Sequence, residues 1–159
     1  MAILYLRFIW RILHHKWWIL FYEIKIGGIP LWRLIVHDWT KFSRAEFKPR
    51  FRYQIQKVIG KESAEWKACV DHHHRHNAHH WQYWVRNGIA QPIPETYVRE
   101  MIVDWLAADK TYCDGITSWL REEFPKMNLH QETVQLMKSI LVSQGIHLSD
   151  WHEPRCLTT

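Results

Sequence analysis

The chain has 159 residues, of which 47% are hydrophobic and 23% charged, and its formal net charge is +5. This length suits a single domain with its own core, and this composition excludes an intrinsically disordered chain. The cysteines form no CxxC pair, which argues against a cysteine-based zinc site, and the small basic excess fits an anionic substrate or nucleic acid.

The N-terminal segment 2–26 carries apolar side chains at mixed three- and four-residue spacings and stops at Gly27-Gly28, which predicts a long first helix. Arginine and lysine residues interrupt its apolar run well before the roughly 20 residues that span a bilayer. No small-residue cleavage site follows a compact apolar stretch, so a signal peptide is not expected. We therefore expect no transmembrane segment. A buried helix is favoured, and a helix lying on a membrane surface is the alternative.

Pro30 opens a second, short helix that runs into an HD dipeptide. Ser43 and Glu46 then have the spacing of a capping box, which predicts a third helix that runs on to Gly60. A fourth helix is expected from about Ser63, and it leads into the histidine-rich stretch "DHHHRHNAHHW".

The chain after this stretch is broken first by Asn87-Gly88 and a pair of prolines. Pro94 looks like the first residue of a strong helix, "PETYVREMIVDWLAADK". Pro125 closes a short helix, and "HQETVQLMKSILVSQG" reads as a last amphipathic helix. With no internal repeat and no useful strand pattern, we predict one all-α domain over residues 1–145, followed by a C-terminal tail, 146–159.

Residue types that bind metal ions occur on several of these predicted helices. Six imidazoles in nine positions are hard to place in a packed core, because each one needs a hydrogen-bond partner. His15, His37-Asp38 and Asp104 lie beside apolar helical stretches elsewhere in the chain. A helical bundle can bring such residues to one interior point. Mixed His and Asp ligands suit one or two divalent transition-metal ions, with Mn, Fe, Co and Zn as the candidates.

This order of His, His-Asp, His and Asp resembles that of the HD-domain superfamily of metal-dependent phosphohydrolases. The resemblance implies a compact HD-domain-like helical bundle. It also implies a set of metal ligands, His15, His37, Asp38, His73 and Asp104. A further ligand from His79 or His80 could complete a second site. The segment "HDWTK" is similar to the HDxxK variant, which implies that Lys41 contacts the substrate phosphate.

Four pieces of the chain resemble an uncharacterised phage and bacterial family that is itself similar to HD domains. They are "HKWW", "LWRLIVHDWTKFSRAEF", "HHRHNAHHWQYW" and "PETYVREMIVDWLAA". The family elements read HDxSKFSxxEF, NxHHxxYW and MPxxYxxEMxxDW, and they match in order over residues 13 to about 140. Thr40, Ala78 and Ile93 replace the usual Ser, Pro and Met without removing a candidate ligand. With the scattered cysteines, the resemblance implies the cytoplasm of a bacterium or of a phage-infected host.

Within the histidine run, His73 is the expected ligand because it matches the HH element of the family. In a continuous helix His73 and His80 would share a face, an argument that fails if Asn77 ends the helix. His74 and His76 are expected to be surface groups or substrate contacts.

The chemistry that these residues favour is hydrolysis of a nucleotide or related phosphate ester by metal-activated water. Lys41 and Arg44 could neutralise the charge of the phosphoryl group. Glu100, four residues before Asp104, suits either a general acid or base or a carboxylate that orients a histidine ligand, and Glu46 has the same two roles beside capping. Substrate contacts are expected from Arg44, His76 and Asn77.

Two other classes of function remain open from the sequence. A di-iron site on the same scaffold could run oxygen chemistry in place of hydrolysis. A non-enzymatic, basic and Trp-rich module could bind nucleic acid or a membrane surface and use the histidines for a structural metal. The second alternative predicts an exposed stripe of aromatic side chains.

Overall fold

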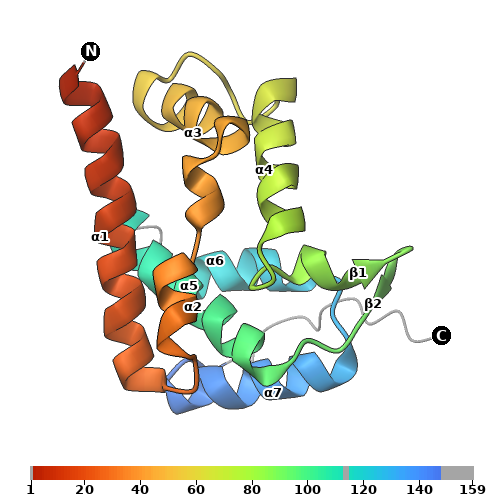
Figure 1. The fold of residues 1–159 in the computed structure, drawn as a ribbon. Helices are drawn as coiled ribbons and strands as arrows, with labels where there is room; N and C mark the ends of the chain where they lie inside the picture. Colours follow the sequence, from red (N-terminus) through yellow and green to blue (C-terminus); the bar gives the residue numbers. More distant parts are fainter. Residues whose placement is uncertain (1, 113–114, 148–159) are drawn as a thin grey trace.

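A computed structural model describes residues 2–112 and 115–147 (Figure 1). In these residues seven α-helices, a few short helical turns and one two-stranded hairpin form the fold, which confirms the all-α prediction. The two longest helices, α1 (Ala2–Ile26) and α5 (Glu95–Tyr112), share the most extensive helix–helix contact of the described chain. They are the scaffold on which the other elements pack.

Helix α1 ends at the predicted pair of glycines for a physical reason. Gly27 and Gly28 have φ values of 69° and 91°, which residues other than glycine rarely adopt. A Cβ atom on Gly28 would lie 2.7 Å from Cδ of Arg99. The Arg99 guanidinium donates hydrogen bonds of 3.3 Å to the carbonyls of Ile26 and Gly27 and so caps the helix.

Helix α2 (Leu31–Val36) is joined through Asp38 to the 3₁₀ turn η1 (Trp39–Phe42) and then to α3 (Arg44–Phe51). Asp38 has left-handed backbone geometry, with φ of 58°. This conformation turns the chain between α2 and η1.

The capping-box prediction is wrong in its hydrogen bonds. Ser43 does occupy the N-cap position of α3, but its side chain makes no cap bond. Glu46 is turned inward and pairs with buried His73, so its carboxylate does not reach back to Ser43. The predicted end of this helix is also wrong. A π-helical turn η2 (Arg52–Gln56) follows α3, and Lys57, with φ of 57°, ends it before Gly60.

Helix α4 (Ala64–His76) begins as predicted, because the Ser63 hydroxyl accepts a hydrogen bond of 3.2 Å from the Trp66 amide. It ends where Asn77 becomes extended, so His73 and His80 do not share one helix. After the 3₁₀ turn η3 (Trp81–Trp84), strands β1 (Val85–Arg86) and β2 (Ile89–Ala90) pair across the predicted turn. Strands this short carry no alternating pattern, and the hairpin was not predicted.

The C-terminal helices end near the proline and the glycine that the sequence analysis gave as their ends. Helix α6 (Ile116–Glu123) passes into the 3₁₀ turn η4 (Phe124–Lys126), which contains Pro125, and α7 (Gln131–Ser143) ends before Gly145. Ile146 packs against the core, whereas residues 148–159 of the predicted tail lie outside the described residues. The core between these helices includes Val98, Ile102, Leu106, Leu120, Met137 and Leu141.

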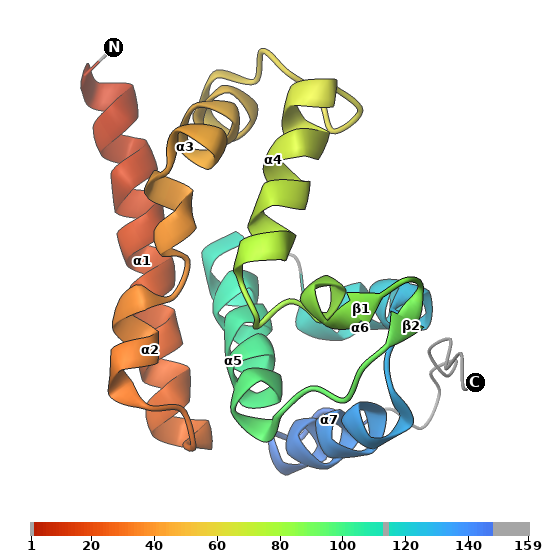
Figure 2. The same cartoon turned by 45° about the vertical axis from the view of Figure 1, so that its right-hand side comes forward.

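Helix α1 is the most apolar long segment of the sequence, but it is not long and apolar enough to cross a bilayer. The same holds for every other helix in the described ranges. Helices α1 and α2 lie along one side of the molecule and α4 stands opposite them, with α5 between (Figure 2). The candidate ligands lie on these elements and on the links between them.

Candidate metal centre

All seven predicted metal ligands meet in the interior. They come from α1, the α2–η1 link, α4, the loop after α4 and α5. Five of them are at most 6% exposed. The seven are His15, His37, Asp38, His73, His79, His80 and Asp104.

Asp38 lies at the centre of this group. Its Oδ2 atom is 3.6 Å from Nε2 of His15 and 3.3 Å from Nε2 of His37. Its Oδ1 atom is 3.2 Å from Nε2 of His73 and 3.5 Å from Nε2 of His79. Each carboxylate oxygen therefore faces a different pair of imidazoles, so Asp38 could contribute one oxygen to each of two ligand sets.

The first ligand set consists of His15, His37, Asp38 and Asp104, with one ligand atom from each within 4.8 Å of the others. Oδ1 of Asp104 lies 2.9 Å from Nε2 of His15 and 3.4 Å from Nε2 of His37. Two carboxylates and two imidazoles, all buried or nearly so, suit a divalent transition metal.

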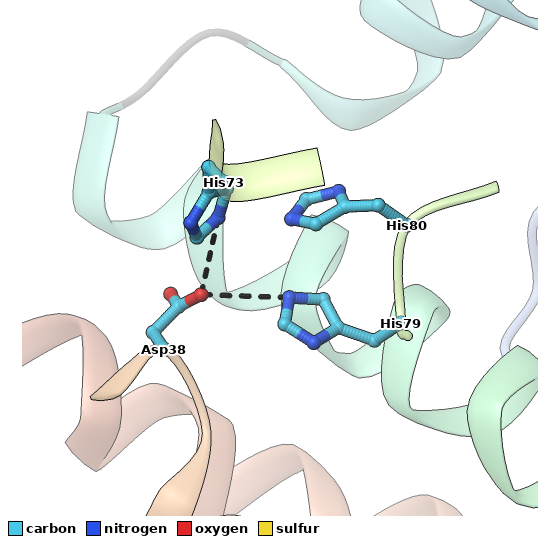
Figure 3. A group of neighbouring side chains, drawn as sticks. All are labelled: Asp38, His73, His79 and His80. Carbon is cyan, nitrogen blue, oxygen red and sulfur yellow. Dashed lines mark ion pairs between the residues drawn. The ribbon is translucent and has the colours of Figure 1, made fainter. Parts of the chain in front are cut away.

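The second ligand set consists of Asp38, His73, His79 and His80, and one ligand atom from each again lies within 4.8 Å of the others. Figure 3 shows the three imidazoles gathered around the aspartate, with His73 and His79 paired to it. The sequence led us to expect one ligand from His79 and His80, and the structure brings both rings within reach of this second set. A turn closed by the hydrogen bond from the His80 amide to the Asn77 carbonyl (3.1 Å) lets both adjacent rings reach the centre.

Several buried atoms of this centre have no hydrogen-bond partner. They are Nε2 of His37, His79 and His80 and Oδ1 of Asp38. A buried polar atom without a partner costs roughly 1–3 kcal/mol, so a cluster of them in one small space needs an explanation. All of these atoms belong to the two ligand sets, and cations bound in both sets would satisfy them. The donor chemistry therefore fits a metal centre.

Glu100 holds two of the imidazoles from their other side. Its Oε1 atom lies 3.0 Å from Nδ1 of His37 and 3.6 Å from Nδ1 of His79. Arg33 donates hydrogen bonds of 2.9 and 2.5 Å to the second oxygen, so the carboxylate is fully engaged. An acceptor at Nδ1 fixes the tautomer and leaves Nε2 free for a metal. Of its two predicted roles, Glu100 therefore has the geometry for orienting ligands.

Glu46 holds an imidazole of the second set at its Nδ1 atom in the same way. One of its oxygens lies 2.9 Å from Nδ1 of His73 and the other 2.9 Å from Nδ1 of His72. Arg50, one helical turn further along α3, donates to Glu46 at 3.2 Å. Surrounding cations and hydrogen bonds outweigh the effect of burial and lower the pKa of Glu46 to about 2. A carboxylate that stays ionised in this way suits orientation better than proton transfer near neutral pH.

Asn77 is buried and has a structural role. Its side-chain amide donates hydrogen bonds of 2.8 Å to Oγ1 of Thr40 and 2.8 Å to the carbonyl of His73. These bonds tie the end of α4 to η1. The prediction that Asn77 contacts substrate has no support in this geometry, because the side chain points into the protein.

The charge states of three groups in the centre are set by burial and by their neighbours. Burial would raise the pKa of Asp38, but Lys41, His37 and His73 hold it well below its usual range, so Asp38 is ionised. Burial lowers the pKa of His80 well below its usual range, which keeps this ring neutral. Burial would also lower the pKa of His37, but the nearby carboxylates, first of all Asp38, raise it well above its usual range.

A cavity of about 250 Å³ adjoins both ligand sets. Lys41, which forms a close ion pair with Asp38, lines it together with Arg50. Tyr53 and Trp66, stacked with ring centroids 4.0 Å apart, lie on its wall. The cavity thus combines metal-ligand atoms, two cations and an aromatic surface.

Two predicted substrate contacts are not brought to this cavity. Arg44 is exposed at the start of α3, and His76 is exposed and stacks on His72 with centroids 4.1 Å apart. Arg50 and His74 line the cavity in their place. The spacing of Arg50 four residues after Glu46 was a signal that these two side chains share a face of α3.

The chain belongs to the family of unknown function DUF5662, whose family model matches residues 5–143. This span covers all seven ligands and both glutamates that hold them. Nothing matches the chain among curated proteins or among solved structures.

Proposed function

We propose that this protein is a metal-dependent phosphohydrolase acting on a nucleotide or a related phosphate ester. The observation that carries the proposal is the position of Asp38, whose two oxygens face two separate ligand sets. Paired metal sites bridged by a carboxylate are well suited to displacement at phosphorus. The likeness of the HD dipeptide and its spaced partners to HD domains supports the same class.

A bound divalent ion would lower the pKa of a coordinated water toward about 7 and polarise a phosphoryl oxygen. The protein's own part is to hold the ligands ready. Asp38 is kept ionised by its neighbours, and Glu100 and Glu46 aim the Nε2 atoms inward. Because mixed imidazole and carboxylate ligands are present, Mn, Fe, Co and Zn are the candidate ions.

Lys41 and Arg50 supply the positive charge for an anionic substrate. Both line the cavity, and both are held by carboxylates, Asp38 and Glu46 respectively. Loss of one donor that stabilises charge developing in a transition state commonly costs 10²- to 10³-fold, or roughly 3–4 kcal/mol. Lys41 keeps its proposed role at the phosphate, and Arg50 takes the role that the sequence gave to Arg44.

The aromatic wall favours a nucleotide over a simpler phosphate ester. The face of a nucleobase stacks well on aromatic side chains, and such stacking is worth about 1–3 kcal/mol per base. Tyr53 and Trp66 are close enough to the cations for one ligand to reach both features within the same cavity. The free thiol of buried Cys69 and a nucleotide substrate together fit a cytoplasmic location.

The proposal is tested by turnover. Protein purified without a histidine tag would be assayed against nucleoside mono-, di- and triphosphates with added Mn, Co, Fe or Zn. We expect release of phosphate or pyrophosphate from at least one nucleotide with one of these ions, and no release by Asp38→Ala. If no nucleotide or other phosphate ester in the panel turns over with any ion, the hydrolase assignment is wrong, and metal-dependent oxygen chemistry becomes the alternative to test.

A further inference from the structure

The outer side of α1 is apolar along its whole length. Seven large side chains recur at alternating three- and four-residue spacings, and each is between 38% and 79% exposed. The opposite face of the same helix holds Phe8, Ile12 and Ile19 in the core. The exposed residues are Ile3, Leu6, Trp10, Leu13, Trp17, Leu20 and Ile24.

Helix α2 and the turn η1 add a second apolar strip. Its exposed members are 48–65% exposed. The two strips lie on neighbouring elements, because Nζ of Lys16 on α1 donates to the carbonyls of Ile35 (3.0 Å) and His37 (2.7 Å) at the end of α2. Figure 2 shows α2 lying along the lower half of α1. The members of the second strip are Leu31, Trp32, Ile35, Val36 and Trp39.

The charges of this part of the chain have one sign at the surface. Residues 2–52 contain only three acidic side chains, Glu23, Asp38 and Glu46, and all three are buried. The exposed charged residues of the same segment are all basic, namely Arg7, Lys25, Arg44 and Lys48. A broad apolar surface on α1, which also exposes the basic Arg7 and Lys25, is therefore complementary to an anionic, partly apolar partner.

We propose that this apolar face, formed by the two strips on α1, α2 and η1, binds the surface of a membrane that contains anionic phospholipids. Four exposed tryptophans, Trp10, Trp17, Trp32 and Trp39, lie on it. Indole rings prefer the boundary between lipid and water, where the ring is apolar and the N–H remains hydrated. Basic residues beside such a surface attract anionic headgroups.

A second copy of the chain fits this face less well. Two copies would bring the exposed basic residues of both chains to one interface, and like charges oppose such pairing. The three- and four-residue spacing on α1 resembles a coiled-coil seam, but Trp10 and Trp17 occupy alternate positions where two-stranded coils hold Ile or Val. The apolar face also extends over α2 and η1, beyond the width of a single helical seam.

The face does not overlap the candidate metal centre. His15, the ligand on α1, is buried on the opposite side of that helix, so lipid contact leaves the ligand sets in place. Membrane binding and catalysis can therefore be tested separately with different substitutions.

The test is co-sedimentation of the full chain with vesicles of phosphatidylcholine alone and of phosphatidylcholine mixed with phosphatidylglycerol. We expect binding to the mixed vesicles that weakens as salt is added. Trp10→Ala with Trp17→Ala should lower the partition coefficient by at least about tenfold, because two large apolar side chains lose their contact with lipid. Arg7→Gln with Lys25→Gln should lower it by about thirtyfold on mixed vesicles, since each basic residue near an anionic surface contributes about fivefold.

Val58→Ala with Tyr83→Ala is the matched control, because both residues are exposed away from this face, and its binding should equal that of the wild type. Circular dichroism checks that each variant is folded. The proposal is overturned if the wild type binds equally to both kinds of vesicle. It is also overturned if the tryptophan variant binds the mixed vesicles as strongly as the wild type does. So does a stable dimer in solution that Trp10→Ala dissociates and that does not bind vesicles.

Discussion

The two ligand sets share Asp38 but are assembled in different ways. His15, His37 and Asp104 come from α1, the end of α2 and α5, and so depend on the packing of helices far apart in the chain. His73, His79 and His80 come from one stretch of the chain at the end of α4. The first set should therefore respond to changes in global packing, whereas the second should respond to the local turn at Asn77.

The largest effect is expected from Asp38, where the two sets meet. Asp38→Ala should abolish metal binding in both sets, and with it the activity of the protein, because it removes the shared carboxylate. Helical content should remain intact, since the loss concerns coordination and not packing. Metal analysis, phosphate release and circular dichroism on the same sample check this. Full activity in the variant would contradict the shared role of Asp38.

The two sets can be separated with one substitution in each. Asp104→Ala should weaken metal binding in the first set, and His79→Ala in the second, so each variant should keep about half of the bound metal. Both should lose most activity if two ions act together. Elemental analysis of the two purified variants gives the result. Equal and complete metal loss in both would show that the sets do not bind independently.

Substitution of Lys41 tests the role of positive charge near the substrate and not that of metal coordination. Lys41→Met should leave metal content unchanged, because an ammonium group is not a ligand here, and should lower kcat/KM by about 10²-fold or more. Lys41→Arg should restore little, since a planar guanidinium differs from a point charge in shape and reach. Arg44→Met is the matched control on an exposed basic residue and should keep wild-type rates. Unchanged activity in Lys41→Met would remove Lys41 from the site.

The raised pKa of His37 gives a pH prediction. Ligand imidazoles must be neutral, so an ion that binds the first set displaces the proton that His37 holds in the metal-free protein. Metal affinity should therefore rise with pH until the raised pKa of His37 is passed. Calorimetric titration in two buffers of different ionisation enthalpy measures the released proton. The same heat in both buffers would contradict the expected protonation of His37.

The smallest effect is expected at the exposed end of the histidine run. His76→Ala should have near wild-type activity, because His76 is exposed and contacts His72 instead of the cavity. His74→Ala should change substrate affinity more, since His74 lines the cavity. Steady-state kinetics on both variants measure the difference. A larger loss in His76→Ala than in His74→Ala would contradict this placement.

The sequence was sufficient for the order of the helices, though not for the end of α3, and for the residues that meet in the two candidate ligand sets, because residue type and order carry that information. It could not predict that Asp38 faces both sets, since this follows from a left-handed residue between two short helices. It also placed Arg44 in the site instead of Arg50. Which side chains of α3 point inward depends on its packing against α4, which spacing along the chain does not define.

Metal stoichiometry tests the central claim most directly. Untagged protein would be stripped with a chelator, titrated with Mn, Fe, Co or Zn, and followed by elemental analysis and thermal unfolding. We predict about two equivalents bound per chain and a higher Tm, because an ion that binds only the folded state stabilises it by about 2.7 kcal/mol at a free concentration of 100 Kd. Protein that binds none of these ions and keeps the same Tm in their presence would contradict the account.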